Sequence, residues 1–145
     1  MPQSPLEVLR SVPILSNVPE SDLVALAQAS RERSYPAGQV ILRQDAPGDA
    51  MYVVVDGELV ASLQRNGRRT ELSRMRRGDT AGEVALFHGT RTADVDVETD
   101  ARLLRFDQAD LDRLARRYPR IAAKVYRNLN RIIAQRIANT SQALR

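Results

Sequence analysis

The chain has 145 residues, which corresponds to a single domain that is large enough to bury its own hydrophobic core. It contains no cysteine and one histidine, so disulfides, thiolate metal sites, cysteine nucleophiles and multi-histidine metal centres are excluded. The net charge of +4 is carried almost entirely by arginine and favours an anionic partner, which could be a nucleic acid, a membrane surface or a small phosphate.

Neither end nor interior of the chain carries a membrane signal. No apolar run approaches the roughly 20 residues that a membrane-spanning helix needs. The N-terminus lacks the basic segment followed by an apolar core that marks a secretory signal. We therefore expect a cytoplasmic protein that does not span a membrane itself.

The first 32 residues are predicted to form a helical segment. Leu6, Val8 and Leu9 make a short apolar face. The stretch from Pro19 to Asp22 is typical of a helix start, and apolar residues follow it at helical spacing.

From residue 33 to residue 106 the pattern changes to short strands. β-branched or alternating runs are separated by turn signals at intervals of about 8 to 12 residues. Asp56-Gly57 and Asn66-Gly67 are dipeptides that favour two-residue hairpins. This region is predicted to form a mainly β sandwich or barrel of about eight strands.

After Phe106 the helical period returns. Asp107 is the predicted N-cap of a helix that ends near Arg117, because Tyr118 precedes a proline and avoids helical geometry. A long amphipathic helix is predicted from 120 to about 138. Its apolar face would suit a homodimer formed through this helix.

The sequence GEVALFHGTRTADV, residues 82–95, interrupts the strand pattern with good helix formers. A short helix opened by Gly82 would direct free backbone N–H groups at an anion. Arg91 adds a forked donor suited to phosphate, and Glu83 adds a carboxylate suited to holding a hydroxyl. A sugar phosphate or a nucleotide has both groups. The other interpretation is a weak surface ion pair within a loop.

Phrases along nearly the whole chain resemble the cyclic-nucleotide-binding domain family of catabolite-activator regulators, cyclic-nucleotide-dependent kinases and gated channels. They are LRSVPILSNVPESDLVALA, YPAGQVILRQDAPGDAMYVVVDGELV, GEVAL…RTADV and LLRFDQADLDRLARRYP. The resemblance implies one domain over 1–145, built as a jelly-roll-like double-stranded β-helix with flanking helices. Its parts would be an N-terminal helical segment (1–32), a β-roll (33–106) containing a phosphate cassette (81–93), and C-terminal lid helices (107–145).

The resemblance also implies roles for the cassette residues. Glu83 would accept a hydrogen bond from the ribose 2′-hydroxyl, and Arg91 would neutralise the cyclic phosphate. Thr92 could bond to a guanine amino group, which leaves cGMP open beside cAMP. The implied ligand-binding residues are Gly82, Glu83, Val84, Ala85, Arg91 and Thr92.

Arginines on the last helix are candidates for a cap over the base. The basic stripe, which consists of Arg120, Lys124, Arg127 and Arg131, follows helical spacing. It could be a solvated face, a contact for an anionic partner, or the source of a base cap from Arg127 or Arg131. Asp94, Asp96 and Glu98 alternate along a strand and are expected to face outward for solubility.

The expected function is a regulatory domain for signal transduction that binds cAMP or cGMP and has no catalysis, metal or other cofactor. It would transmit binding through its C-terminal helices to a fused or partner effector. Two alternatives remain. One is a degenerate fold that serves protein interaction or dimerisation, since Ala81 replaces the usual aromatic and the interval from Glu83 to Arg91 is one residue short. The other is a truncated transcription regulator, since no helix-turn-helix domain for DNA follows the long helix.

Overall fold

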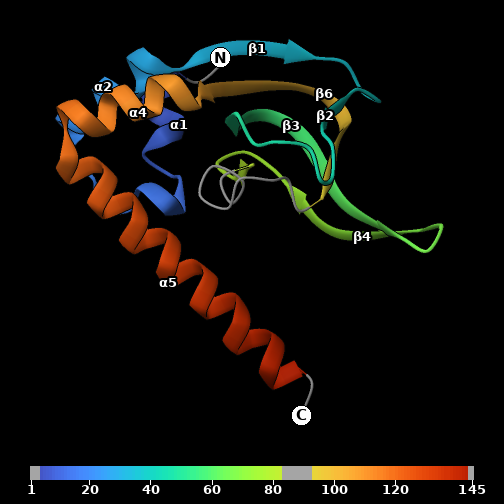
Figure 1. Ribbon diagram of the computed structural model, residues 1–145. Coiled ribbons are helices and arrows are strands. Elements are labelled where there is room, and N and C mark those ends of the chain that lie inside the picture. Colours follow the sequence, from blue (N-terminus) through green and yellow to red (C-terminus); the bar gives the residue numbers. More distant parts are fainter. Residues whose placement is uncertain (1–3, 83–92, 144–145) are drawn as a thin grey trace.

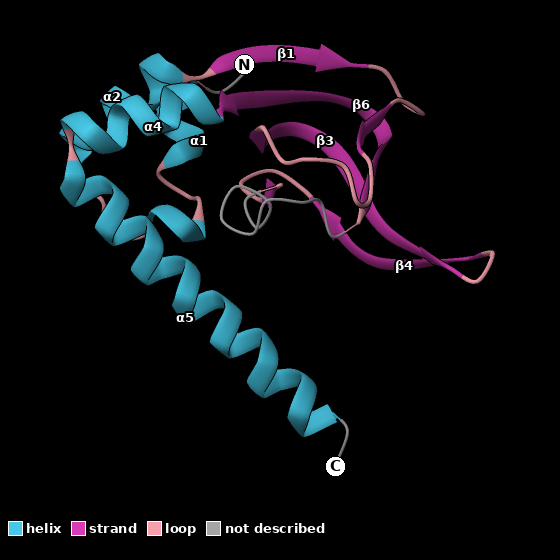
Figure 2. Ribbon diagram, viewed as in Figure 1, coloured by secondary structure: helices cyan, strands magenta, loops and turns pink. Residues whose placement is uncertain are grey.

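The computed structural model describes residues 4–82 and 93–143. Helices gather on one side of a curved antiparallel sheet, and the last helix extends away from the strands (Figures 1 and 2). In the described ranges no helix is long and apolar enough to cross a membrane.

The N-terminal segment folds into three short helices. They are α1 (Pro5–Leu9), the 3-10 helix η1 (Pro13–Leu15) and α2 (Glu20–Ala29). Ser4 caps α1 by accepting a hydrogen bond from the Glu7 backbone N–H at 3.3 Å. The helices are short because prolines open each new turn of structure, at the first position of α1 and of η1 and just before α2.

The sheet contains six strands in the described part of the chain, all paired antiparallel, which confirms the predicted mainly β class. They are β1 (Arg31–Tyr35), β2 (Val40–Leu42), β3 (Ala50–Arg65), β4 (Arg68–Met75), β5 (Thr80–Ala81) and β6 (Asp94–Asp107). The order is β1-β6-β3-β4, with β2 also paired to β6 and β5 to β3. The described residues form six strands where about eight were predicted, because β3 and β6 are long and each covers a stretch that the sequence pattern divided into shorter strands.

Two similar dipeptides take different structures, one inside β3 and the other just after it. Asn66 and Gly67 both have positive φ, at 54° and 76°, and form the predicted hairpin between β3 and β4. The hairpin predicted at Asp56-Gly57 is wrong, because β3 continues through it with shifts in its register against β6. Gly57, with φ of 92°, lets the strand bend there without ending.

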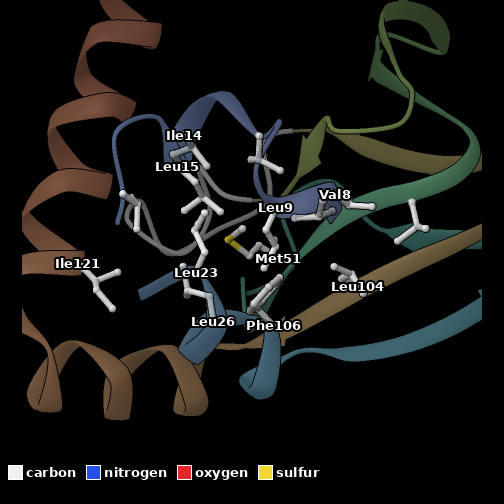
Figure 3. Packing of buried hydrophobic residues seen from close by; sticks show 14 of the residues in the cluster. Val8, Leu9, Ile14, Leu15, Leu23, Leu26, Met51, Leu104, Phe106 and Ile121 are labelled. Atoms are coloured by element: carbon white, nitrogen blue, oxygen red, sulfur yellow. The ribbon is translucent and has the colours of Figure 1, made fainter. Parts of the chain in front are cut away.

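The sheet separates two hydrophobic clusters. Alternate residues of β3 face opposite sides, so Met51, Val53 and Val55 join the outer cluster beneath the helices, and Tyr52 and Val54 join the inner cluster of the roll. Figure 3 shows the outer cluster, where side chains from the N-terminal helices meet those of the sheet. This double burial explains why the run from Met51 to Val55 is apolar throughout.

Two helices follow the last strand: α4 (Gln108–Arg117) and α5 (Pro119–Ala143). Tyr118, with φ of −129° and ψ of 73°, breaks the helix before Pro119 as predicted. Asp107 occupies the predicted N-cap position but makes no capping bond. Its carboxylate instead accepts a hydrogen bond from Arg105 Nε at 2.7 Å. α5 extends beyond the predicted end near 138, and its C-terminal half lies clear of the strands (Figure 1).

Candidate functional site

The cassette connects β5 to β6, and both of these strands pair with β3. Ala81 of β5 pairs with Tyr52 of β3, and Asp94, at the start of β6, pairs with Ser62 of β3. Gly82 begins the cassette with a φ of 87°, a left-handed conformation that favours glycine. The other predicted ligand-binding residues lie outside the described residues; they are Glu83, Val84, Ala85, Arg91 and Thr92.

A polar cluster fixes the strand that follows the cassette. Arg69 Nη2 lies 3.2 Å from Asp94 Oδ2, and Arg69 Nη1 lies 3.1 Å from Asp96 Oδ2. Asp94 Oδ1 also accepts a hydrogen bond from the Gln44 backbone N–H at 2.6 Å. The sequence predicted outward solubility positions here. For Asp94 that interpretation is wrong, because Arg69 lies over the carboxylate and leaves its side chain 15% exposed.

The inner wall of the roll is apolar next to the cassette. The buried side chains of this inner cluster are Leu42, Ala50, Tyr52, Val54, Leu59, Ala61, Met75, Ala81, Val95, Val97, Ala101 and Leu103. None carries a formal charge. A charged group bound on this face must therefore find its counter-charge in the cassette, or in side chains at the rim of the roll.

Three polar side chains of α5 fasten the helix to the N-terminal segment. Arg120 Nη2 donates to Asp22 Oδ1 at 2.8 Å, and Lys124 Nζ donates to the Asn17 carbonyl oxygen at 2.8 Å. Asn128 Nδ2 donates to the carbonyl oxygens of Ile14, at 3.0 Å, and of Ser16, at 2.8 Å. We call these contacts the polar ladder. Arg120 and Lys124 of the basic stripe thus attach α5 to the N-terminal segment.

Asp22 is the buried end of the ladder, with a side chain that is 3% exposed. The hydrogen bonds from Arg120 hold the pKa of the Asp22 carboxyl below its ordinary value of 3.8, although burial opposes this, and the charges of Arg120 and Lys124 act in the same direction as the bonds. Asp22 and Asn128 were missed from the sequence. Asp22 was taken as part of a helix start, and Asn128 gave no signal of its carbonyl partners.

Family comparison adds a second line of observation to this geometry. Residues 32–118 match the family model of the cyclic nucleotide-binding domain. The chain belongs to this family. The match covers the roll from β1 to α4 together with the cassette, so the residues that carry the predicted binding motif lie within it.

Relatives and solved structures agree with this assignment. The chain is 35% identical over 108 residues to the cAMP-dependent protein kinase regulatory subunit of Schizosaccharomyces pombe, covering 74% of this chain and 26% of that protein. It is 26% identical over 140 residues to the CRP-like cAMP-activated global transcriptional regulator of Mycobacterium tuberculosis, covering 95% and 61%. The N-terminal domain of a transcriptional regulator from Streptomyces coelicolor superposes with a TM-score of 0.78, at 26% identity and 95% coverage of each chain. The chain therefore spans less than two thirds of either relative.

Within this cyclic nucleotide-binding domain, the two candidate base-cap residues lie on α5. Arg131 Nη2 donates to Asn128 Oδ1 at 2.7 Å, so it belongs to the end of the polar ladder. Arg127 is exposed. The cassette residues that they would face lie outside the described ranges, and the base cap stays a prediction.

An apolar cavity of about 210 Å³ lies beneath α4 and α5. Side chains from η1, α2, β3, β6, α4 and α5 line it, among them Met51, Phe106, Leu111, Ile121 and Tyr126. A space without partner atoms weakens the packing of the side chains around it. The side chains between α4, α5 and the sheet are therefore incompletely packed.

No metal chemistry is indicated by the side chains that the structure describes. Over residues 4–82 and 93–143, no group of three or more histidine, aspartate or glutamate side chains is arranged to hold a metal ion. What the described side chains offer beside the cassette is the apolar wall of the inner cluster.

Proposed function

We propose that this domain is a sensor for cAMP or cGMP and passes the binding signal through α4 and α5 to a fused or partner effector. The observation that carries the proposal is the match of residues 32–118 to the cyclic nucleotide-binding domain, a range that contains the predicted cassette residues Gly82, Glu83 and Arg91. The apolar wall beside the cassette also supports the proposal. Because that wall supplies no charge, it leaves the counter-charge of a bound phosphate to the cassette, where Arg91 is found.

Each cassette residue has a distinct chemical role in this proposal. The Arg91 guanidinium would pair with the cyclic phosphate through two N–H groups, and Glu83 would accept a hydrogen bond from the ribose 2′-hydroxyl. The backbone N–H groups of Gly82, Val84 and Ala85 would complete the cradle. Thr92 would bond to a guanine amino group if the ligand is cGMP.

Transmission would use the junction between the roll and the lid helices. The polar ladder joins α5 to the N-terminal segment, so these two parts would move together. The cavity beneath α4 and α5 lowers the packing energy that opposes such a movement. A ligand that favours one of two lid positions would then shift the population between them.

A second proposal concerns the effector. The similarity to the N-terminal domain of a transcriptional regulator favours a DNA-binding effector following α5 in a longer protein.

The 25-residue α5, with its C-terminal half away from the roll, would also suit a homodimer formed through this helix. In this case gel filtration with light scattering should give twice the mass of the chain, and a monomer at high concentration would contradict dimerisation.

Calorimetric titration with cAMP, cGMP and 5′-AMP tests the sensor proposal. We expect micromolar or tighter binding of at least one cyclic nucleotide. Arg91→Ala should weaken it about 30-fold or more, because losing the partner of a desolvated phosphate costs about 2–5 kcal/mol. Glu83→Ala should cost less, near the about 1.5–3 kcal/mol of a hydrogen bond to a charged group.

Arg68→Ala is the matched control, since it removes the same charge from an exposed arginine of the β3–β4 hairpin. Its affinity should equal that of the wild type. Absence of heat with both cyclic nucleotides at millimolar concentration would refute the sensor proposal, and equal binding by Arg91→Ala would refute the role of Arg91.

A further inference from the structure

A basic groove lies along the edge strand β1. Its lining includes Arg31, Arg33 and Tyr35 of β1, Gln39, and Arg105 and Asp107 of β6, and its volume is about 540 Å³. In the sheet order, β6 and β3 separate β1 from β5, where the cassette begins. None of these lining residues belongs to the cassette.

Cations are concentrated on one face of this edge. Arg31 pairs directly with Arg105 across the two strands, and Arg33 lies on the same face two residues along β1. Like charges opposite one another in a sheet repel, so this pair needs an anion. Asp107 lies between them, with Oδ1 at 2.7 Å from Arg105 Nε and Oδ2 at 4.0 Å from Arg31 Nε.

The charges of the groove do not balance. Besides Asp107, the Asp49 carboxylate acts electrostatically on Arg105. Counting Asp49, two carboxylates thus act on the three guanidinium groups, and only Asp107 lines the groove. Glu32 is turned to the other face of β1, where it pairs with Arg102. Arg33 is exposed and makes no hydrogen bond or ion pair with the residues that the structure describes. The excess positive charge is therefore on Arg33.

The floor of the groove is held in place by its own contacts. Arg105 Nη1 donates to the Tyr52 hydroxyl at 2.8 Å, and the Arg105 guanidinium lies 5.7 Å from the centroid of the Tyr52 ring. The Tyr35 and Tyr52 rings meet edge to face at 6.2 Å. The guanidinium of Arg105 thus has a fixed orientation while its side chain stays 30% exposed, so an anion can reach it without reorganisation.

We propose that this basic groove is a second anion site, which takes a small phosphate-bearing molecule through Arg33 and Arg105. Arginine forks suit the oxygens of a phosphate, and a doubly charged phosphate would offset the excess charge. The groove volume lies within the range of small-molecule sites, which leaves room for an organic group against Tyr35.

Two probes distinguish a free phosphate ion from an organic phosphate ester: inorganic pyrophosphate and phenyl phosphate. Each is titrated by calorimetry at low ionic strength into an Arg91→Ala variant of the full chain, so that the cassette arginine contributes nothing. We expect saturable binding of at least one probe, with amide NMR shifts concentrated in residues 31–39. Tighter binding of phenyl phosphate indicates an ester packed on Tyr35; tighter binding of pyrophosphate indicates an inorganic ion.

Adding Arg33→Ala should weaken the binding about tenfold or more, since an arginine–phosphate pair is removed. The fold should be unchanged because Arg33 is exposed. Adding Arg68→Ala instead, which removes the same charge elsewhere, should change affinity less than about twofold. Absence of saturable binding of both probes overturns the proposal, and so does binding that Arg33→Ala and Arg68→Ala weaken equally.

Discussion

The two faces of the sheet are built differently. The outer face carries large side chains such as Leu104 and Phe106, which pack under helices that polar contacts tie together. The inner face is lined mostly by alanines, valines and leucines, together with Tyr52 and Met75, and leads into the cassette at Gly82. The outer face therefore joins the sheet to the helices, whereas the inner face would depend on its rim and cassette for recognition. Substitutions on the two faces should separate stability from binding.

The largest stability effect is expected on the outer face. Phe106, which is 1% exposed, fills the cluster in Figure 3, and Phe106→Ala should lower the free energy of unfolding by about 3–5 kcal/mol through lost contacts and a cavity. Urea denaturation measures this. Phe106→Leu keeps more of the volume and should cost about 1.5 kcal/mol or less. The comparison fails if Phe106→Ala is as stable as the wild type.

An intermediate effect is expected at the buried end of the polar ladder, and it depends on pH. The folded state holds the Asp22 pKa below the ordinary value of 3.8, so the contribution of this carboxylate is complete above that value and is lost as pH falls through the lower folded-state pKa. Thermal unfolding of the wild type and Asp22→Asn should therefore differ at pH 7, and the difference should shrink as pH falls below 3.8 and through the lower folded-state pKa of Asp22.

Arg120→Ala provides the matched variant for this test. It leaves the Asp22 carboxylate buried without its guanidinium partner, whereas Asp22→Asn leaves an exposed guanidinium that water can solvate. Arg120→Ala should therefore lower the melting temperature at pH 7 more than Asp22→Asn does. The reverse order would show that the ladder does not depend on desolvation of Asp22.

The smallest stability effect is expected at Arg69, beside the cassette. Its side chain is 50% exposed, so Arg69→Ala should cost about 1 kcal/mol or less. Binding should suffer more than stability, because Asp94 and Asp96 lose the contact that fixes the start of β6 after the cassette. Calorimetry with cAMP and cGMP should show weakening of severalfold, and the exposed variant Arg68→Ala should show none. Wild-type affinity in Arg69→Ala would show that the contacts of Arg69 with Asp94 and Asp96 do not affect ligand binding.

Local patterns predicted what depends on neighbouring residues. Asn66-Gly67 and the break at Tyr118 were predicted because the dipeptide or the following proline determines the backbone. Asp56-Gly57 misled because its structure depends on a distant strand: a Cβ at Gly57 would lie 2.5 Å from the Asp100 carbonyl oxygen. The cassette could be recognised because its motif is contiguous, and its ligand contacts stay predictions.

The distant partners of charged residues were beyond local reasoning. Asp22 and Arg120 are 98 residues apart, and an acidic residue in the first turn of a helix already has a local explanation in the helix dipole. Arg69 and Asp94 come from different strands whose register follows from the β3–β4 hairpin and the bend in β3. Charge patterning along one element therefore suggested solvated faces where the fold makes specific contacts.

The polar ladder has a consequence for how this chain can diverge during evolution. Lys124 and Asn128 bond to the carbonyl oxygens of Asn17, Ile14 and Ser16, which are main-chain atoms that every amino acid supplies. The side chains on the N-terminal partner of these bonds can thus vary without loss of the acceptors. For these bonds selection acts on the donors of α5, so homologues should retain donors at 124 and 128 while Ile14 and Ser16 drift in sequence. The Arg120–Asp22 pair depends on both of its side chains and should vary less.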